Sequence, residues 1–146
     1  MRVLQKRKKT AVYVETLLES ALPGLPAADR ALCQELVYGV VRWQRTLDWL
    51  IARKTQDRCQ KATLQILLRL GLYQLCWLDR VPHHAAVHET VEQAKQLGLG
   101  PQSGFVNALL RGYARENQEA RRLLADLKAS QPALGCSHPD WLCDRW

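Results

Sequence analysis

A strongly apolar stretch lies between Lys61 and Asp79 and reads KATLQILLRLGLYQLCWLD. Its apolar residues are not confined to one stripe, and a helix that is apolar almost all round is surrounded by neighbouring elements. A membrane span is the competing interpretation, but the run is short for one and contains Gln65, Arg69 and Gln74, which are costly in lipid. The pattern therefore predicts a central, buried helix whose three polar residues mark a narrow side that reaches polar partners.

Before this stretch, apolar residues recur every three or four positions and predict three helical segments. The first ends at the Pro-Gly-Leu-Pro sequence of residues 23–26, because glycine and proline interrupt helices. The second opens at Asp29, and its Gly39 allows a bend or the close approach of a neighbour. The third contains Leu50, and we expect a break between the second and the third near residues 43–45.

After the stretch, helices are expected to start at Pro82, Ser103 and Asn117. The tail from Ser130 to Trp146 is different, since it contains two prolines and a glycine and ends in SHPDWLCDRW, like an interrupted element. No part of the sequence shows the alternation of apolar and polar residues that is typical of a strand. The fold class is therefore predicted to be all-α.

Charge adds a candidate partner. The 146 residues suffice for one domain with a real core, and the formal net charge is +7. The excess lies in residues 1–61, whereas residues 62–146 are almost balanced. An uneven basic charge suggests an anionic partner, with nucleic acid ahead of a membrane surface, although a merely soluble basic surface explains the charge equally well.

The five cysteines are odd in number, and no two of them have CxxC spacing. This pattern favours reduced thiols in a cytoplasmic protein over a disulfide framework or a zinc site. Cys136 and Cys143 have no base beside them, so a catalytic thiol is not expected. The sequence has no apolar segment after its basic start, no GxGxxG and no P-loop, so neither a signal peptide nor a nucleotide-binding βαβ unit is expected.

Two polar groups follow Pro82. His84 and His88 are four residues apart, as two metal ligands on a helix could be, but no third ligand is placed by spacing. Polar residues near a helix start explain them better, and no metal is expected. Glu92 and Lys95 are three residues apart and are expected to form a surface ion pair worth a few tenths of a kcal/mol.

The basic residues fall into two groups. The first is an amino-terminal arm made of Arg2, Lys6, Arg7, Lys8 and Lys9. In the second, Arg42, Arg45, Trp49 and Arg53 have the spacing i, i+3, i+7 and i+11, which lines them along one helix side next to Lys54. Trp43 and Trp49 are interleaved with this group. Such surfaces suit single-stranded or looped RNA, because arginine binds phosphate and aromatic rings stack on unpaired bases, whereas a solvated face with core tryptophans fits the spacing equally well.

Three segments resemble a known family, the NusB-type RNA-binding fold. They are ADRALCQELVYGVVRWQRTLDWLI (residues 28–51), LLRLGLYQLCWLDRVPHHAAVHETVEQAK (67–95) and GFVNALLR (104–111). The resemblance covers roughly residues 10–115 and is greatest to the amino-terminal NusB-like domain of the RsmB (Sun/Fmu) ribosomal RNA methyltransferases. A segment similar to SHPDWLCDRW links that domain to the catalytic part in those enzymes.

The resemblance implies a NusB-like bundle of two packed helical subdomains around the central buried helix. It divides the chain into a helical RNA-binding domain (residues 1–128) and a linker (residues 129–146) that would lead into a catalytic domain. In those methyltransferases a separate domain binds S-adenosylmethionine and methylates a cytosine at carbon 5, and its motifs are missing from this sequence. We therefore expect no cofactor and no catalytic residue in this chain, and S-adenosylmethionine only in a full-length parent.

The resemblance also bears on individual residues. Stand-alone NusB proteins contact RNA through a basic amino-terminal region and act in transcription antitermination with a ribosomal-protein-like partner. The arm is short here, so these contacts transfer only loosely, onto Arg2 and Lys6 to Lys9. Within FVNALLR, the resemblance implies that Asn107 is a structural hydrogen-bonding residue.

We therefore expect a cytoplasmic RNA-binding domain that docks small-subunit ribosomal RNA for an RsmB-type methyltransferase and is not catalytic by itself. Its predicted RNA-binding residues are Arg2, Lys6, Arg7, Lys8, Lys9, Arg42, Arg45, Arg53 and Lys54. Two alternatives stay open. One is a stand-alone antitermination factor that binds a short leader RNA, and the other is a helical protein-binding adaptor.

Overall fold

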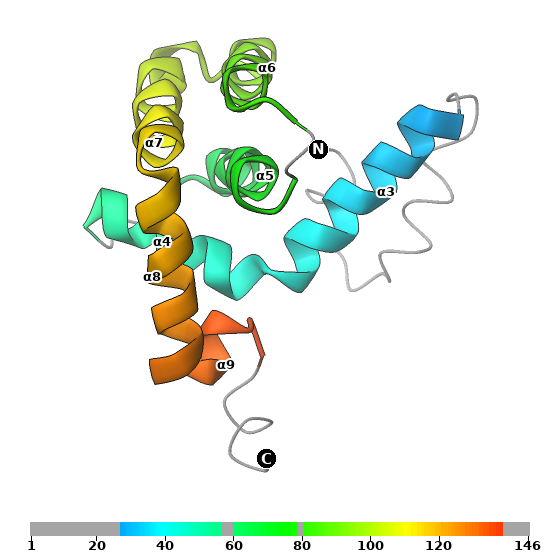
Figure 1. The fold of residues 1–146 in the computed structure, drawn as a ribbon. Coiled ribbons are helices and arrows are strands. Elements are labelled where there is room, and N and C mark those ends of the chain that lie inside the picture. The colour runs from blue at the N-terminus through cyan, green and yellow to red at the C-terminus, as the bar shows by residue number, and fades with distance from the viewer. Residues whose placement is uncertain (1–26, 57–59, 79–80, 139–146) are drawn as a thin grey trace.

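The apolar stretch forms helix α5 (Ala62–Trp77) in the computed structural model, which describes residues 27–56, 60–78 and 81–138. Most of its residues are buried on every side, because it packs against α3, α4, α6, α7 and α8 (Figure 1). The prediction of a central, buried helix is confirmed. Within the ranges that the structure describes, no helix is long and apolar enough to cross a membrane.

The described residues are almost entirely helical and contain no strand, which confirms the all-α class. Around α5 they form α3 (Ala27–Arg42), α4 (Gln44–Thr55), α6 (His83–Gln96), the 3-10 turn η1 (Gly100–Gln102), α7 (Ser103–Arg115), α8 (Asn117–Ser130) and α9 (Pro132–Gly135). The predicted break falls at Trp43, and the predicted starts at Pro82, Ser103 and Asn117 lie within one residue of the observed ones. The helix expected before residue 23 lies outside the described residues.

Two groups of helices meet on α5 (Figure 1). Helices α3 and α4 pack against it from one side, and the antiparallel pair α6 and α7 packs from another. Helix α8 follows α7 and contacts α5. The short helix α9 follows α8, and the chain there turns back so that α9 packs against α4. The carboxyl end of the described chain therefore lies on the junction of α3 and α4, beside Arg42 and Arg45.

The predicted polar side of α5 reaches α4. Arg69 donates from Nε to Oδ1 of Asp48 at 2.7 Å and from Nη2 to Oδ2 at 2.9 Å. Gln65 donates to the same Oδ1 at 2.8 Å, whereas Gln74 donates to the Leu70 carbonyl of its own helix. Since the Arg69 side chain is only 7% exposed, this charge-assisted ion pair fixes α4 on the central helix α5.

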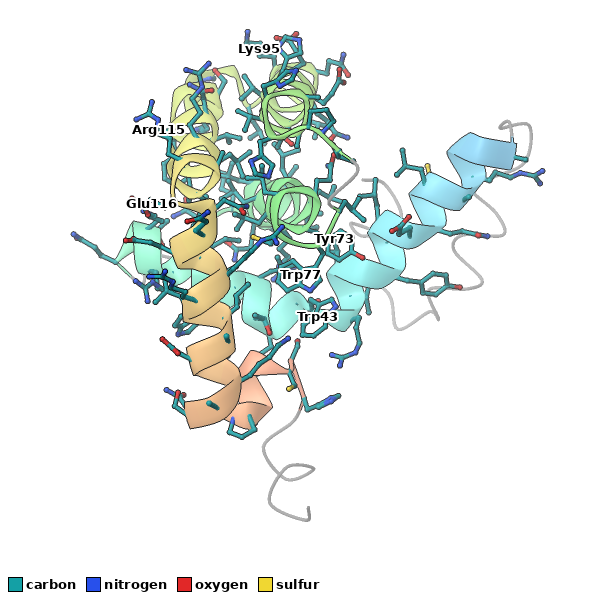
Figure 2. All side chains as sticks on the ribbon, viewed as in Figure 1. Trp43, Tyr73, Trp77, Lys95, Arg115 and Glu116 are labelled. Atoms are coloured by element: carbon teal, nitrogen blue, oxygen red, sulfur yellow. The ribbon has the colours of Figure 1, made fainter. Side chains whose placement is uncertain are left out.

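Gly39 lets α3 approach α5 closely. A Cβ added there would lie 2.0 Å from Cζ of Tyr73, so only a residue without a side chain fits. The Tyr73 ring stacks on Trp77 with centroids 5.8 Å apart, and Trp77 lies 5.2 Å from the Trp43 ring. Figure 2 shows the three rings together where α5 meets α3 and α4. Of the two roles predicted for Gly39, the structure supports close approach.

Candidate nucleic-acid interface

The structure describes four of the nine predicted RNA-binding residues. The five residues of the amino-terminal arm lie outside the described ranges. The other four lie on α3 and α4 and are exposed. Because the chain breaks at Trp43, Arg42 ends α3 and the remaining three belong to α4, so the predicted line of side chains crosses a helix junction.

Arg42 and Arg45 both bind the chain's own tail. Nη1 of Arg42 donates to the Cys136 carbonyl at 2.7 Å, and its Nη2 lies 3.5 Å from Nε2 of His138. Nη1 of Arg45 donates to the His138 carbonyl at 2.7 Å. These contacts could not be predicted from the sequence, because their acceptors are backbone carbonyls, which every residue has. The two arginines therefore hold the segment that follows α9 against the α3–α4 junction.

The same segment completes the start of α4. The first backbone N–H groups of a helix have no partner within it, and here the Arg45 N–H donates to Oγ of Ser137 at 3.1 Å. Next to it, the buried hydroxyl of Thr46 donates to the Leu134 carbonyl at 2.7 Å. Ser137 thus caps α4 from 92 residues away in the sequence. This docking makes residues 131–138 an ordered part of the fold.

Replacing Arg42 and Arg45 together by Gln is expected to loosen this segment. Hydrogen exchange of the His138 amide, which donates to the Ala133 carbonyl, should become about tenfold faster, because two charge-assisted hydrogen bonds that hold the local structure are lost. Exchange measured by mass spectrometry or NMR gives the rate. The matched control replaces Arg53 and Lys54 by Gln, and equal exchange in both variants would contradict the clamp.

Arg53 and Lys54 lie at the other end of α4, about 12 Å along the helix from Arg45. The Arg53 guanidinium lies over the Trp49 ring, 5.1 Å from its centroid. Lys54 Nζ is 3.2 Å from Oε2 of Glu116 and 5.0 Å from the Tyr113 ring centroid. Both cations are exposed, so these weak contacts leave them accessible to an anion.

The two tryptophans are not free platforms for base stacking. Trp43 is half-buried, with Trp77 5.2 Å away and the cations of Arg42 and Lys128 at 4.4 and 5.5 Å from its centroid. Trp49 is also half-buried, packs against the core and carries Arg53 on its ring. Of the two interpretations left open for them, core tryptophans beneath a charged face agrees with the structure.

The candidate catalytic and metal residues give no site in the part of the chain that the structure describes. No group of three or more histidines, cysteines or carboxylates there could hold a metal ion. Burial raises the pKa of the Cys76 thiol to about 11, so it stays protonated at neutral pH. Cys136 is half-buried, and Cys143 lies outside the described residues. The predicted ion pair of Glu92 with Lys95 is present at 3.3 Å.

A pocket that the sequence did not reveal lies between α6 and α7. Its volume is about 530 Å³, and it is lined by His83, His84, Val87, His88, Val91, Asn107, Arg111, Ala114 and Arg115. The Asn107 side chain makes no hydrogen bond with a described residue, so the structural role that the resemblance implied stays a prediction. Asn107, Arg111 and Arg115 recur every four residues and so share one face of α7. That spacing was the available signal, but only the packing of α6 on α7 brings it opposite the histidines.

Comparison with known proteins agrees with the fold. A family model described as the NusB family matches residues 1–115. A probable ribosomal RNA small subunit methyltransferase B of Synechocystis is 42% identical over 149 residues, which cover 97% of this chain and 32% of the relative. The ribosomal RNA small subunit methyltransferase B of Pseudomonas putida is 40% identical over 131 residues, covering 86% of this chain and 29% of the relative. A probable ribosomal RNA small subunit methyltransferase B of Bacillus subtilis is 34% identical over 150 residues, which cover 100% of this chain and 33% of the relative. The chain thus spans about a third of the length of these curated relatives.

Proposed function

Because the chain belongs to the NusB family, we propose that it is an RNA-binding domain that docks small-subunit ribosomal RNA for an RsmB-type cytosine-C5 methyltransferase. The observation that carries the proposal is the pattern of coverage. Relatives named as ribosomal RNA small subunit methyltransferases align with nearly all of this chain but with only about a third of themselves. This agrees with one module of a larger enzyme, and it favours that function over a stand-alone antitermination factor or a protein-binding adaptor.

In this proposal the basic residues bind phosphates. They are Arg2, Lys6, Arg7, Lys8, Lys9, Arg42, Arg45, Arg53 and Lys54. The tail contacts of Arg42 and Arg45 do not prevent this, because a guanidinium has five N–H donors and each tail carbonyl occupies one. Phosphates on the exposed sides of these cations would lie next to the docked tail. RNA and the tail would then share one surface.

The proposal assigns residues 1–128 to RNA binding and residues 129–146 to a linker that leads toward a catalytic part. That part would carry S-adenosylmethionine and the methyl-transfer chemistry in the cytoplasm. This chain would supply no catalytic residue and bind no cofactor. A methyl-transfer assay with S-adenosylmethionine and small-subunit ribosomal RNA should therefore show no turnover by this chain, and turnover would contradict the assignment.

RNA affinity is expected to fall steeply with salt. Each phosphate neutralised by a cation on single-stranded RNA releases counterions, so the slope of log K against log salt should be about −0.7 per contact, or roughly −3 for four contacts. Fluorescence anisotropy with a labelled small-subunit ribosomal RNA hairpin measures it between low and physiological salt. A hairpin of scrambled loop sequence is the control for sequence preference. No binding at low salt, or binding that salt does not change, would refute the proposal.

A further inference from the structure

The pocket between α6 and α7 is built from two facing rows of polar side chains. On α7 the row consists of Asn107, Arg111 and Arg115, and on α6 it consists of His84 and His88. Members of each row are four residues apart, so they lie above one another along their helix. Figure 2 shows Arg115 near the end of α7, on the side of the molecule away from α3.

Between these rows the pocket has an apolar part and no negative charge. Val87, Val91 and Ala114 contribute aliphatic surface, and no carboxylate belongs to the lining. Among the lining residues, His83 is half-buried, with its Nε2 3.5 Å from Nδ2 of Asn117. A volume of about 530 Å³ falls in the range of small-molecule sites in proteins. The pocket therefore suits a ligand with one flat or apolar part and one anionic part.

The two arginines of this pocket have no side-chain partner among the described residues, which is also true of some exposed arginines elsewhere, such as Arg30 and Arg122. Arg111 and Arg115 are exposed, and neither makes a hydrogen bond or an ion pair with a described residue. By contrast, Arg42 and Arg45 hold the tail, Arg69 is paired with Asp48, and Lys54 is paired with Glu116. Two guanidinium groups on one helix face suit a phosphate, because they can contact it through several N–H donors.

Asn107 supplies the polar group that an anion alone would not need. Its amide is half-buried and carries one acceptor and two donors, none of which is used by a described residue. This combination can pair with the donor and acceptor edge of a nucleobase, and histidine rings and aliphatic side chains can cover the face of a base. Inorganic phosphate would use only the arginines and leave this amide and the apolar part unfilled.

We infer that the α6–α7 pocket holds one unpaired nucleotide of the bound RNA, with its phosphate on Arg111 and Arg115 and its base between the histidine row and Asn107. The inference rests on the proposed function and adds a second contact region to it. The ligand class is thus a looped or single-stranded RNA with at least one base free to enter.

Replacing Arg111 and Arg115 together by Gln tests the inference. Affinity for the labelled small-subunit ribosomal RNA hairpin should fall about tenfold or more, and the salt slope should become shallower by about 1.4, because two phosphate contacts disappear. The matched control replaces Arg30 and Arg122, two exposed arginines outside the pocket, by Gln and should change affinity less than about threefold. Equal losses in both variants would overturn the inference in favour of a general charge effect.

A second pair of variants and a cross-linking experiment locate the contact. Replacing the exposed His84 and His88 by Ala should weaken binding by about threefold without a change in far-UV circular dichroism. With 4-thiouridine in the hairpin loop, cross-linked peptides should come from residues 83–91 and 107–115. Wild-type protein that binds no RNA would refute the proposed function itself. RNA binding that survives both variants, with cross-links only elsewhere, would refute the pocket and leave the proposed function standing.

Discussion

Replacing Asp48 by Ala is expected to lower the free energy of unfolding by about 3 kcal/mol, because it leaves the Arg69 guanidinium buried without its counter-charge. Arg69 is 7% exposed and donates to both carboxylate oxygens, at 2.7 and 2.9 Å. Removing one partner of a buried pair typically costs about 3–5 kcal/mol. The low end applies because the Asp48 side chain is 36% exposed and water can take part of its place.

Chemical and thermal unfolding measure this effect. For a chain of this size the midpoint should fall by about 6 to 12 °C. The matched control is the double variant Asp48→Ala, Arg69→Met, which removes the charge together with its partner and should recover most of the loss, since a buried pair replaced by apolar residues is often nearly neutral. A single variant that loses less than about 1 kcal/mol, or a double variant no more stable than the single, would contradict the role given to the pair.

The part of this fold that the sequence predicted is the part encoded in local patterns. Apolar residues all round α5 required surrounding helices, and the polar residues inside that run had to find partners. The sequence did not identify Asp48 as the partner of Arg69, because it lies 21 residues earlier and on another helix. Which carboxylate faces a buried arginine depends on how two helices are packed, and hydrophobic periodicity carries little information on that.

In the candidate interface, too, local spacing was predictable from the sequence, whereas contacts between distant segments were not. Exposed basic residues on α3 and α4 were predictable from their spacing, but the docking of the tail on Arg42 and Arg45 was not, because its acceptors are backbone carbonyls. From the sequence, the spacing of His84 and His88 suggested only two possible metal ligands on one helix. Their opposition to Arg111 across a pocket depends on how α6 lies on α7. Helical spacing places a residue on a face, whereas contacts between helices decide what that face meets.

Gly39→Ala is expected to destabilise the protein, although helix propensity alone would make this substitution stabilising. In the middle of a helix, alanine is usually more stable than glycine by about 1 kcal/mol. Here the new Cβ would lie 2.0 Å from Cζ of Tyr73, whose side chain is buried and stacked on Trp77. Moving that ring disturbs close packing, which typically costs about 1–3 kcal/mol and more for a severe clash. We expect the clash to outweigh propensity, with a net loss of about 2 kcal/mol in urea unfolding.

Two comparisons separate the clash from any general effect of alanine. Gly112→Ala in α7 is the matched control, because its added Cβ would meet only Lys54 at 3.7 Å, and it should stabilise the protein by up to about 1 kcal/mol. In a Tyr73→Leu background, which removes the ring at a cost of its own, Gly39→Ala should become neutral or stabilising. The difference between the two backgrounds is the coupling energy of the pair. If Gly39→Ala costs the same with and without the Tyr73 ring, the close approach of α3 to α5 does not explain the glycine, and helix bending becomes the better explanation.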